Sequence, residues 1–324
     1  MARRIDYGRI AVILSAIIFL IFGADFIRRA YNSWKGENGQ LIVQTHSGVD
    51  PYGTTPTGTA TDPGSQPSGG ETTTTTTTQD VNLPKLTLLA SEIHSGSLVL
   101  VNDTYGWQGE GNYVAFSELN YAHFRLPSRS LQISKTMSAD LIAMFKDFYA
   151  ATNLGNVMIY ATTNTPTALA YQVSIPERAS GLTLDLAVWD EAQGTHSPFK
   201  PEGNYAWLQS HCAEYGFVQR FTADKSAQTG MQQQIWHYRY VGVPHAVYMT
   251  QENLCLEEYL TLLRESHDAG NPLLVTTSDA SYTVYYVPAA EDGGMTEITV
   301  PKDLPITTSG DNMGGYIITI RNAA

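Results

Sequence analysis

A long stretch without core-forming residues limits which part of this chain can fold. Residues Gly36–Asp80 are rich in Gly, Pro, Ser and Thr, and Thr72–Thr78 is an unbroken run of threonine. Such a stretch cannot bury enough apolar surface to offset the entropy that is lost when it is ordered. We therefore expect a disordered stalk over residues 36–82, followed by a folded region that begins near Val81.

An apolar run precedes this stalk. Residues 10–27 contain a single charged residue, Asp25, and three arginines lie before them. A membrane-spanning helix needs about 20 residues, and cleavage after Ala24 would place the bulky Phe22 where a signal peptidase prefers a small side chain. We favour an uncleaved transmembrane signal-anchor helix within residues 1–35. The sequence does not settle whether a signal peptidase cleaves after Ala24. The chain would then be a single-pass cell-membrane protein with a cytoplasmic N-terminus and an extracellular folded domain.

Composition excludes several classes of protein. The chain has 324 residues, of which 43% are hydrophobic, and its net charge is −12. The apolar content supports a hydrophobic core, whereas the basic face of a nucleic-acid binder is missing from the sequence. The two cysteines, Cys212 and Cys255, exclude a disulfide-rich scaffold and a cysteine-based zinc finger. The sequence does not decide whether these two cysteines form a disulfide, and we favour two buried free thiols.

The folded region mixes helices and strands without a regular β-α-β alternation. Apolar residues recur at helical spacing in Met137–Thr152, where Ser138 is the predicted N-cap. Further predicted helices are Tyr205–Tyr215 and Asn253–His267. Predicted strands are Ser97–Asn102, Asn156–Ala161, Leu182–Val188 and Trp236–Val241. These elements indicate an α+β fold without a glycine-rich nucleotide loop.

The C-terminal residues alternate as β-strands do. The predicted strands are Tyr282–Val287, Thr296–Pro301 and Gly315–Ile320, with Gly-rich turn signals between them. We expect a main domain over residues 83–271 and a small β module over residues 272–324. The module would be marginally stable alone, because it is too small for a core of its own.

Three segments carry motifs in a specific order and spacing. They are Pro176–Leu186, Trp207–Phe221 and Gln234–Gly242. Together they resemble the VanY-type D-alanyl-D-alanine carboxypeptidases, which are zinc peptidases that trim bacterial peptidoglycan stems; the resemblance covers roughly residues 85–270. In that family a His and an Asp seven residues apart bind zinc. A Glu-x-x-His motif adds the third ligand and the general base that activates the zinc-bound water.

Two residues of the zinc site implied by this resemblance are replaced. Asp185 and His237 match the Asp and His ligands, but Arg178 stands at the position of the first His and Gln234 at that of the Glu. Arginine stays protonated in proteins and cannot bind zinc, and glutamine is not a base. We therefore expect no cofactor. Arg178 is expected to pair with Asp185 in place of the metal, and His237 to hydrogen-bond Asp185 or Gln234.

The substrate contacts follow less directly from the resemblance. The family's Ser-Gly-Tyr-Arg stretch, whose Arg is associated with binding the substrate carboxylate, corresponds to Tyr160–Thr165, which contains no arginine. Ser180, Trp236 and Tyr238 are candidate substrate-binding residues. Trp236 and Tyr238 alternate on a predicted strand, so packing in the core is the alternative for whichever of them points inward.

The sequence thus predicts a membrane-anchored, cell-surface protein that resembles a carboxypeptidase but is a pseudoenzyme. It would bind peptidoglycan stem peptides or a cell-wall partner, contact the membrane through residues 10–27, and bind no nucleic acid. One alternative is an active zinc carboxypeptidase with a non-standard site, in which His196 or Glu177 substitutes for a lost residue. A second alternative is a non-enzymatic adhesive or structural module.

Overall fold

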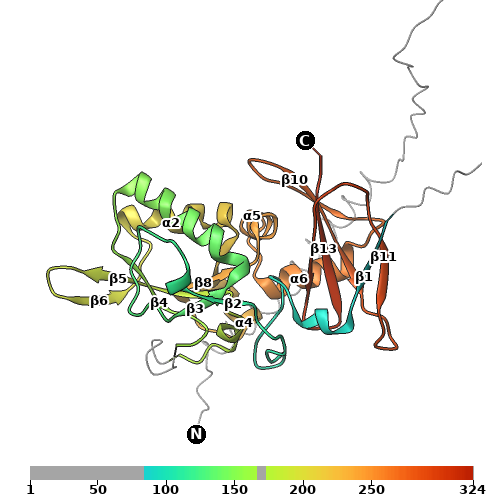
Figure 1. Cartoon of the computed structure of the whole chain (residues 1–324), viewed down its shortest axis with the longest axis horizontal. Coiled ribbons are helices and arrows are strands. Elements are labelled where there is room, and N and C mark those ends of the chain that lie inside the picture. Colours follow the sequence, from blue (N-terminus) through green and yellow to red (C-terminus); the bar gives the residue numbers. More distant parts are fainter. Residues whose placement is uncertain (1–83, 166–172, 324) are drawn as a thin grey trace, which may run out of the picture. The chain divides into compact units, whose positions relative to one another are not determined.

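An antiparallel sheet with strand order β4-β5-β8-β7 lies behind the helices of the first part of the fold, and β6 pairs with β5 (Figure 1). The computed structural model describes residues 84–165 and 173–323. The sheet strands are β4 (Val157–Ala161), β5 (Thr183–Asp190), β6 (Thr195–Pro198), β7 (Phe217–Phe221) and β8 (Gln234–Tyr240). The α-helices are α2 (Ser138–Thr152), α3 (Ala206–His211), α4 (Ser226–Thr229), α5 (Val243–Gln251) and α6 (Leu256–Ser266).

Short elements connect and flank this sheet. The two-stranded sheet before α2 consists of β2 (Tyr113–Ala115) and β3 (Gln132–Ser134). The 3-10 helices are η1 (Ala90–His94), η2 (Phe116–Glu118), η3 (Lys135–Met137), η5 (Pro176–Ser180), η6 (Gly203–Tyr205), η7 (Cys212–Tyr215) and η8 (Ala223–Lys225). Of these, η5 matters most for the site described below, because it leads directly into β5.

The C-terminal strands form a second antiparallel sheet, of order β12-β13-β10-β9. Its strands are β9 (Leu273–Thr276), β10 (Ser281–Pro288), β12 (Ile306–Gly310) and β13 (Gly315–Arg321). A separate pair joins β1 (Lys85–Leu88) to β11 (Thr296–Thr299). The described residues belong to one compact unit, and the domain boundary expected at residue 271 stays a prediction.

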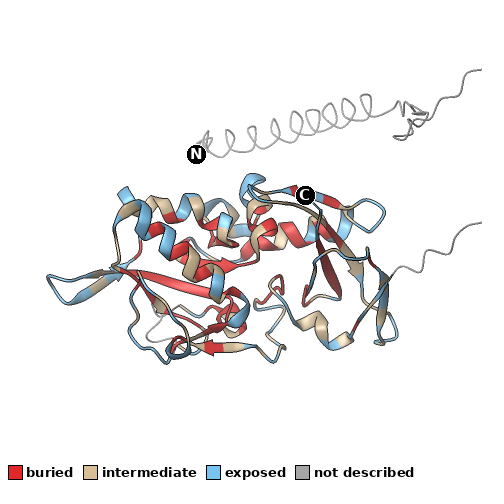
Figure 2. Ribbon diagram, turned by 45° about the horizontal axis from the view of Figure 1, so that its top comes forward, coloured by how far each residue is buried: buried red, intermediate tan, exposed pale blue. Residues whose placement is uncertain are grey.

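Three apolar clusters hold these sheets and helices together, and one of them joins Leu88 of β1 to buried residues of β10 and β13. The predicted helical stripe buries Leu141, Met144, Phe145 and Phe148 of α2 against the central sheet. A second cluster joins buried residues of α5 and α6 to residues of β9, β10 and β13. The C-terminal sheet therefore shares a core with the rest of the fold. Figure 2 colours the buried residues of both parts red. Burial of this kind is the main favourable contribution to folding.

Most predicted elements of the folded region are confirmed, and two details are wrong. Ser138 is the first residue of α2 rather than its N-cap, because η3 runs directly into the helix; its Oγ donates to the carbonyl of Lys135 at 2.8 Å. The segment Ser97–Asn102 is not a strand in the structure. Instead, Arg239 Nη2 donates to the carbonyls of Ser97 and Val99, each at 2.9 Å. A buried guanidinium thus satisfies the backbone groups for which we expected a sheet partner.

The turn between β12 and β13 forms further hydrogen bonds with the segment that begins at Ser97. Asn312 Nδ2 donates to the carbonyls of Leu100 at 2.8 Å and Gly106 at 3.0 Å, and its Oδ1 lies 2.6 Å from His94 Nδ1. Asn312 is buried and has a φ of 62°. The C-terminal sheet therefore positions the segment that in turn holds Arg239.

Replacing Asn312 by Ala is expected to destabilise the protein by about 2–3 kcal/mol, because buried carbonyls lose their donor. Asn204→Ala, at an exposed position of η6, is the matched control and should leave stability unchanged. Urea-induced unfolding of both variants measures the difference. Equal stability of the two variants would show that the contacts of Asn312 do not stabilise the fold.

The signal-anchor helix predicted within residues 1–35 and the stalk predicted over residues 36–82 lie outside the described residues. Within residues 84–165 and 173–323, none of the helices is both long enough and apolar enough to cross a bilayer. Cys212 and Cys255 are two separate free thiols, and both are buried.

Candidate functional site

A single helical turn, η5, brings three of the sequence-predicted residues to the centre of the fold. Pro176 begins the turn, and Gly181 ends it with a φ of 71°. A Cβ at Gly181 would lie 2.7 Å from the ring of Tyr113, so both the backbone angle and the close contact require glycine. The turn buries Glu177 and Arg178, and β5 then carries Asp185 away from it.

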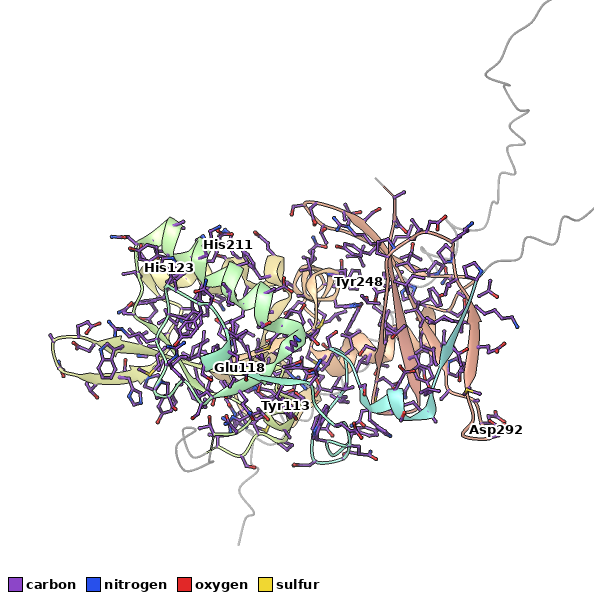
Figure 3. The ribbon with its side chains drawn as sticks, in the orientation of Figure 1. Tyr113, Glu118, His123, His211, Tyr248 and Asp292 are labelled. Atoms are coloured by element: carbon purple, nitrogen blue, oxygen red, sulfur yellow. The ribbon has the colours of Figure 1, made fainter. Side chains whose placement is uncertain are left out.

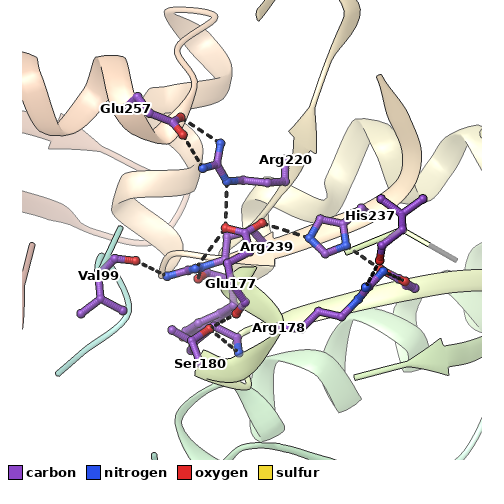
Figure 4. Close-up of polar contacts among 12 residues, drawn as sticks. Val99, Glu177, Arg178, Ser180, Arg220, His237, Arg239 and Glu257 are labelled. Atoms are coloured by element: carbon purple, nitrogen blue, oxygen red, sulfur yellow. Dashed lines mark hydrogen bonds and ion pairs between the residues drawn. The ribbon is translucent and has the colours of Figure 1, made fainter. Parts of the chain in front are cut away.

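Strand register brings Asp185 to its partner. Asp185 on β5 lies directly opposite His237 on β8 in the antiparallel ladder. His237 Nδ1 is 2.5 Å from Asp185 Oδ1, and Arg178 Nη2 donates to Asp185 Oδ2 at 2.5 Å (Figure 4). Arg178 Nη1 also donates to the carbonyl of Val173 at 2.5 Å. The expected Arg178–Asp185 pair is therefore present, and His237 contacts Asp185 rather than Gln234.

His237 lies between two carboxylates. Its Nε2 is 3.0 Å from Glu177 Oε1, and its ring stacks on Phe221 with centroids 5.3 Å apart. Burial alone would lower the pKa of His237, but the charge and hydrogen bond of Asp185, followed by those of Glu177, outweigh it and raise the pKa. An imidazolium in this place donates both of its N–H groups to carboxylates.

Glu177 is the central acceptor of this site, a role that its sequence position did not indicate. Its Oε2 accepts from Arg220 Nε at 3.0 Å and from Arg239 Nη1 at 3.3 Å. Burial raises the pKa of Glu177, but Arg220, His237 and Arg239 reverse this effect and hold the pKa far below its usual value. Burial lowers the pKa of Arg239 to about 10, which leaves it protonated at neutral pH.

We call the connected set of charged side chains the buried ion network. Arg220 joins it to α6 through two hydrogen bonds to Glu257, of 2.9 Å and 2.6 Å. Its carboxylates are Glu177, Asp185 and Glu257, its guanidiniums are Arg178, Arg220 and Arg239, and its imidazole is His237. The three carboxylates balance the three guanidiniums, so protonated His237 adds one positive charge. The sequence gives little indication that these charged residues meet, because they come from four separate elements, β7, β8, η5 and α6.

The residues present do not fit a zinc ion. Zinc requires three protein ligands with free lone pairs, but both nitrogens of His237 and both oxygens of Asp185 are engaged within the network. The guanidinium of Arg178 lies against Asp185, where its charge would repel a cation. Among the described residues, no group of three His, Cys, Asp or Glu side chains could hold a metal ion.

The two substitutes considered from the sequence do not provide a metal site either. His196 on β6 lies opposite Trp189, four residues along β5 from Asp185 and thus about 13 Å away. Its ring packs on Tyr160 with centroids 4.4 Å apart. Glu177 is held by two guanidiniums and His237, as described above.

Gln234 begins β8 and is almost fully buried. Its Oε1 has no hydrogen-bond partner among the described residues. An amide cannot accept a proton from water at neutral pH. The position implied for the general base is therefore occupied by a side chain that cannot activate a nucleophile.

The three candidate substrate-binding residues lie in different surroundings. Ser180 Oγ donates to the carbonyl of Glu177 at 2.6 Å and accepts from Leu182 N at 3.2 Å, which closes the η5 turn. Tyr238 is 1% exposed and packs in the core, with its ring centroid 6.1 Å from that of Phe199. Tyr238 and Trp236 are two residues apart on β8 and therefore lie on the same face of the sheet. Trp236 is partly buried against the same core.

Histidines outside the network have structural surroundings. His211 stacks on Trp207 with centroids 4.4 Å apart, and His123 stacks on Tyr149 of α2 at 4.1 Å. Figure 3 shows both of them beside α2, and neither belongs to the buried ion network. A cavity of about 290 Å³ does adjoin the network, and Glu177 and Arg220 form part of its wall.

Sequence comparison identifies this arrangement. Residues 156–243 match the sequence model of the VanY family, described as D-alanyl-D-alanine carboxypeptidase. These residues resemble the VanY family. The match includes η5, β5 and β8, so the elements that build the buried ion network are the elements that carry the family's motifs.

Individual relatives agree with this assignment. A D-alanyl-D-alanine carboxypeptidase of Enterococcus faecium is 29% identical over 257 residues, covering 74% of this chain and 80% of that protein. A protein of the same name from Enterococcus faecalis (strain ATCC 700802 / V583) is 44% identical over 79 residues, covering 24% and 28%. The region around residues 156–243, called the VanY-type domain below, is thus similar to D-alanyl-D-alanine carboxypeptidases.

A solved structure confirms the type of fold. The vancomycin-resistance D,D-dipeptidase VanXYg, determined in complex with a D-Ala-D-Ala phosphinate analogue, superposes with a TM-score of 0.62 at 24% identity. The superposition covers 74% of this chain and 99% of VanXYg. The predicted mixed α and β fold with VanY-type architecture is therefore confirmed.

Proposed function

We propose that this protein is a cell-surface VanY-type pseudoenzyme that binds peptidoglycan stem peptides or a cell-wall partner without hydrolysing them. The observation that carries the proposal is the Arg178–Asp185–His237 chain of contacts, with spacings of 2.5 Å. The guanidinium supplies the positive charge that a metal would supply in an active relative. It cannot bind and acidify a water molecule, because all its nitrogens carry protons.

For the alternative of an active enzyme, the described residues of this site include no group that could perform the first step of hydrolysis. Hydrolysis of an amide requires a water molecule made nucleophilic by a metal or by a general base. The two positions that would do this hold Arg178 and Gln234, and the network engages the remaining carboxylates with guanidiniums. This arrangement supports a structural role for the former catalytic residues.

The predicted place of action follows from the N-terminal sequence. The apolar residues 10–27 and the polar stalk after them favour an anchor in the cell membrane and an extracellular VanY-type domain. We propose the cavity beside Glu177 and Arg220 as the binding site, since exposed Gln228 at its wall leaves it accessible.

Zinc content tests the loss of catalysis. The wild-type chain is expected to purify without zinc and to release no D-alanine from a stem peptide that ends in D-Ala-D-Ala. The double variant Arg178→His with Gln234→Glu should bind about one zinc per chain, because it restores the third ligand and the base. The double variant Arg178→Lys with Gln234→Glu is the matched control and should bind none. About one zinc in the wild-type chain, or D-alanine release by it, would overturn the proposal.

Calorimetric titration with the same stem peptide tests binding. Gln228→Trp should fill the cavity and weaken binding at least tenfold, whereas Gln251→Trp, at an exposed position of α5, should not. Equal binding by both variants would remove the cavity from the proposal. Absence of binding to stem peptide and to purified cell wall would favour the structural module instead.

A further inference from the structure

Two cavities meet where the C-terminal sheet faces the rest of the fold. The first, of about 420 Å³, is lined by residues that include Ser95, Trp107, Glu110, Asn112 and Ser180. The second, of about 490 Å³, is lined by residues that include Tyr240, Tyr282, Thr307, Thr308 and Thr319. Gly96 and Thr136 line both cavities, so the two cavities lie side by side. We call the two together the seam groove.

Direct contacts between its two sides hold the seam groove open in one shape. At Gly96, φ is 109° and a Cβ would lie 2.4 Å from Ser309 Oγ, so only glycine allows β12 to approach here. Ser309 Oγ also accepts from Leu98 N at 2.9 Å, and Gly310 N donates to the carbonyl of Ser95 at 2.7 Å. The groove is therefore preformed, as small-molecule sites commonly are.

The lining is rich in hydroxyl groups and poor in charge. Glu110 is the one lining residue with a charged side chain at neutral pH, because burial lowers the pKa of His245 to about 3. No Lys or Arg among the described residues lines the two cavities, so none of these residues would pair with a carboxylate or a phosphate. This distinguishes the seam groove from a site for a peptide C-terminus, a nucleotide or an acidic polymer.

Several lining groups are available to a ligand. The side chains of Ser95, Thr136, Thr307 and Thr308 are exposed in this lining, so their hydroxyl groups are accessible to a ligand. A purely apolar partner would leave these hydroxyls without water or partner, at a cost in binding free energy. Trp107 in the first cavity and Tyr282 in the second are partly exposed aromatic rings.

We propose that the seam groove binds a neutral sugar chain. A sugar ring offers apolar C–H groups to an aromatic face and hydroxyls to the Ser and Thr side chains, and it requires no counter-ion. Each cavity is within the size range of small-molecule sites, about 300–1,000 Å³, so the two neighbouring cavities suit successive units of an oligomer. None of the charged side chains of the buried ion network lines the seam groove, and the inference does not depend on the catalytic state of the VanY-type domain.

Binding of the β-1,4-linked tetramer of N-acetylglucosamine to the full chain tests this inference. Trp107→Ala and Tyr282→Ala should each weaken binding about fivefold to tenfold, because each removes one aromatic contact. Thr136→Trp should abolish binding by blocking the junction of the two cavities. Tyr149→Ala, which removes an exposed aromatic ring of α2 outside the groove, is the matched control and should have no effect. Thermal unfolding of each variant verifies that it is folded.

A second experiment distinguishes glycan strands of the cell wall from soluble sugars as the ligand. Sedimentation with purified peptidoglycan should show the same loss in the Trp107 and Tyr282 variants if glycan strands of the wall are the ligand. Loss with the free tetramer alone would assign the groove to soluble sugars. Polygalacturonate, an acidic polymer, should not bind. Failure of the wild-type chain to bind the tetramer, or equal binding by all variants, would overturn the inference. The Arg178→His and Gln234→Glu double variant should bind the tetramer normally, which separates this test from that of the proposed function.

Discussion

Replacing Glu177 by Gln is expected to destabilise the protein by about 3–5 kcal/mol, the usual cost of removing one partner from a buried ion pair. Glu177 is 1% exposed and lies within 3.3 Å of donors from Arg220, Arg239 and His237. Gln has nearly the same shape, so the change removes the negative charge and little else. The buried positive charges then lack the acceptor that compensates their desolvation.

Urea-induced unfolding of the full chain measures this effect against a matched control. Glu297→Gln removes an acid of the same type whose partner, Lys85, is 2.9 Å away at the exposed β1–β11 pair. Because water screens that pair, Glu297→Gln should leave the unfolding midpoint almost unchanged. Similar midpoints for the two variants would show that Glu177 is not the centre of the buried ion network.

Stability is expected to fall as the pH rises above about 6.5, the pKa of an unperturbed histidine. The folded-state pKa of His237 is raised, so above pH 6.5 the unfolded chain loses this proton while the folded chain keeps it. The unfolded state then binds fewer protons, and the free energy of unfolding decreases by about 1.4 kcal/mol per pH unit until the folded-state pKa is reached. The stabilising effect of the imidazolium is fully present below pH 6.5.

At acidic pH, Glu177 changes the free energy of unfolding in the opposite direction, because its stabilising contribution is lost as the pH falls. Its folded-state pKa is lowered, so its contribution is fully present above the unfolded pKa of about 4.3 and is lost as the pH falls further. Stability from the network should therefore be greatest between about pH 4.3 and 6.5. Unfolding free energies measured across this range in the wild-type chain and in His237→Asn test the alkaline side. An unchanged alkaline slope in His237→Asn would assign the effect to another group.

The strands and helices were largely predictable because their signals are local. The apolar spacing of residues 138–152 and the alternation around β5, β8 and β13 appear in the structure as expected. The segment Ser97–Asn102 was wrongly predicted as a strand, because an apolar run of this length does not show which groups form hydrogen bonds with its backbone. Here a side chain from β8, Arg239, supplies the hydrogen bonds.

The candidate site was predictable in part for the same reason. Arg178 and Asp185 are seven residues apart, so the motif spacing sufficed to expect their ion pair. Glu177, Arg220 and Glu257 lie far apart along the chain and belong to no shared motif. Their contacts arise only when β7 and α6 pack beside η5.

By itself, the sequence predicted a polar stalk before a folded region, a resemblance of this region to the VanY family, and the replacement of the family's base and of one zinc ligand. Each of these depends on residue identity at known spacing. Only the tertiary structure decided what the replacements do, because the charge balance around Glu177 depends on groups from distant segments. In a buried, weakly screened place such groups determine one another's protonation and partners, which spacing along the chain cannot show.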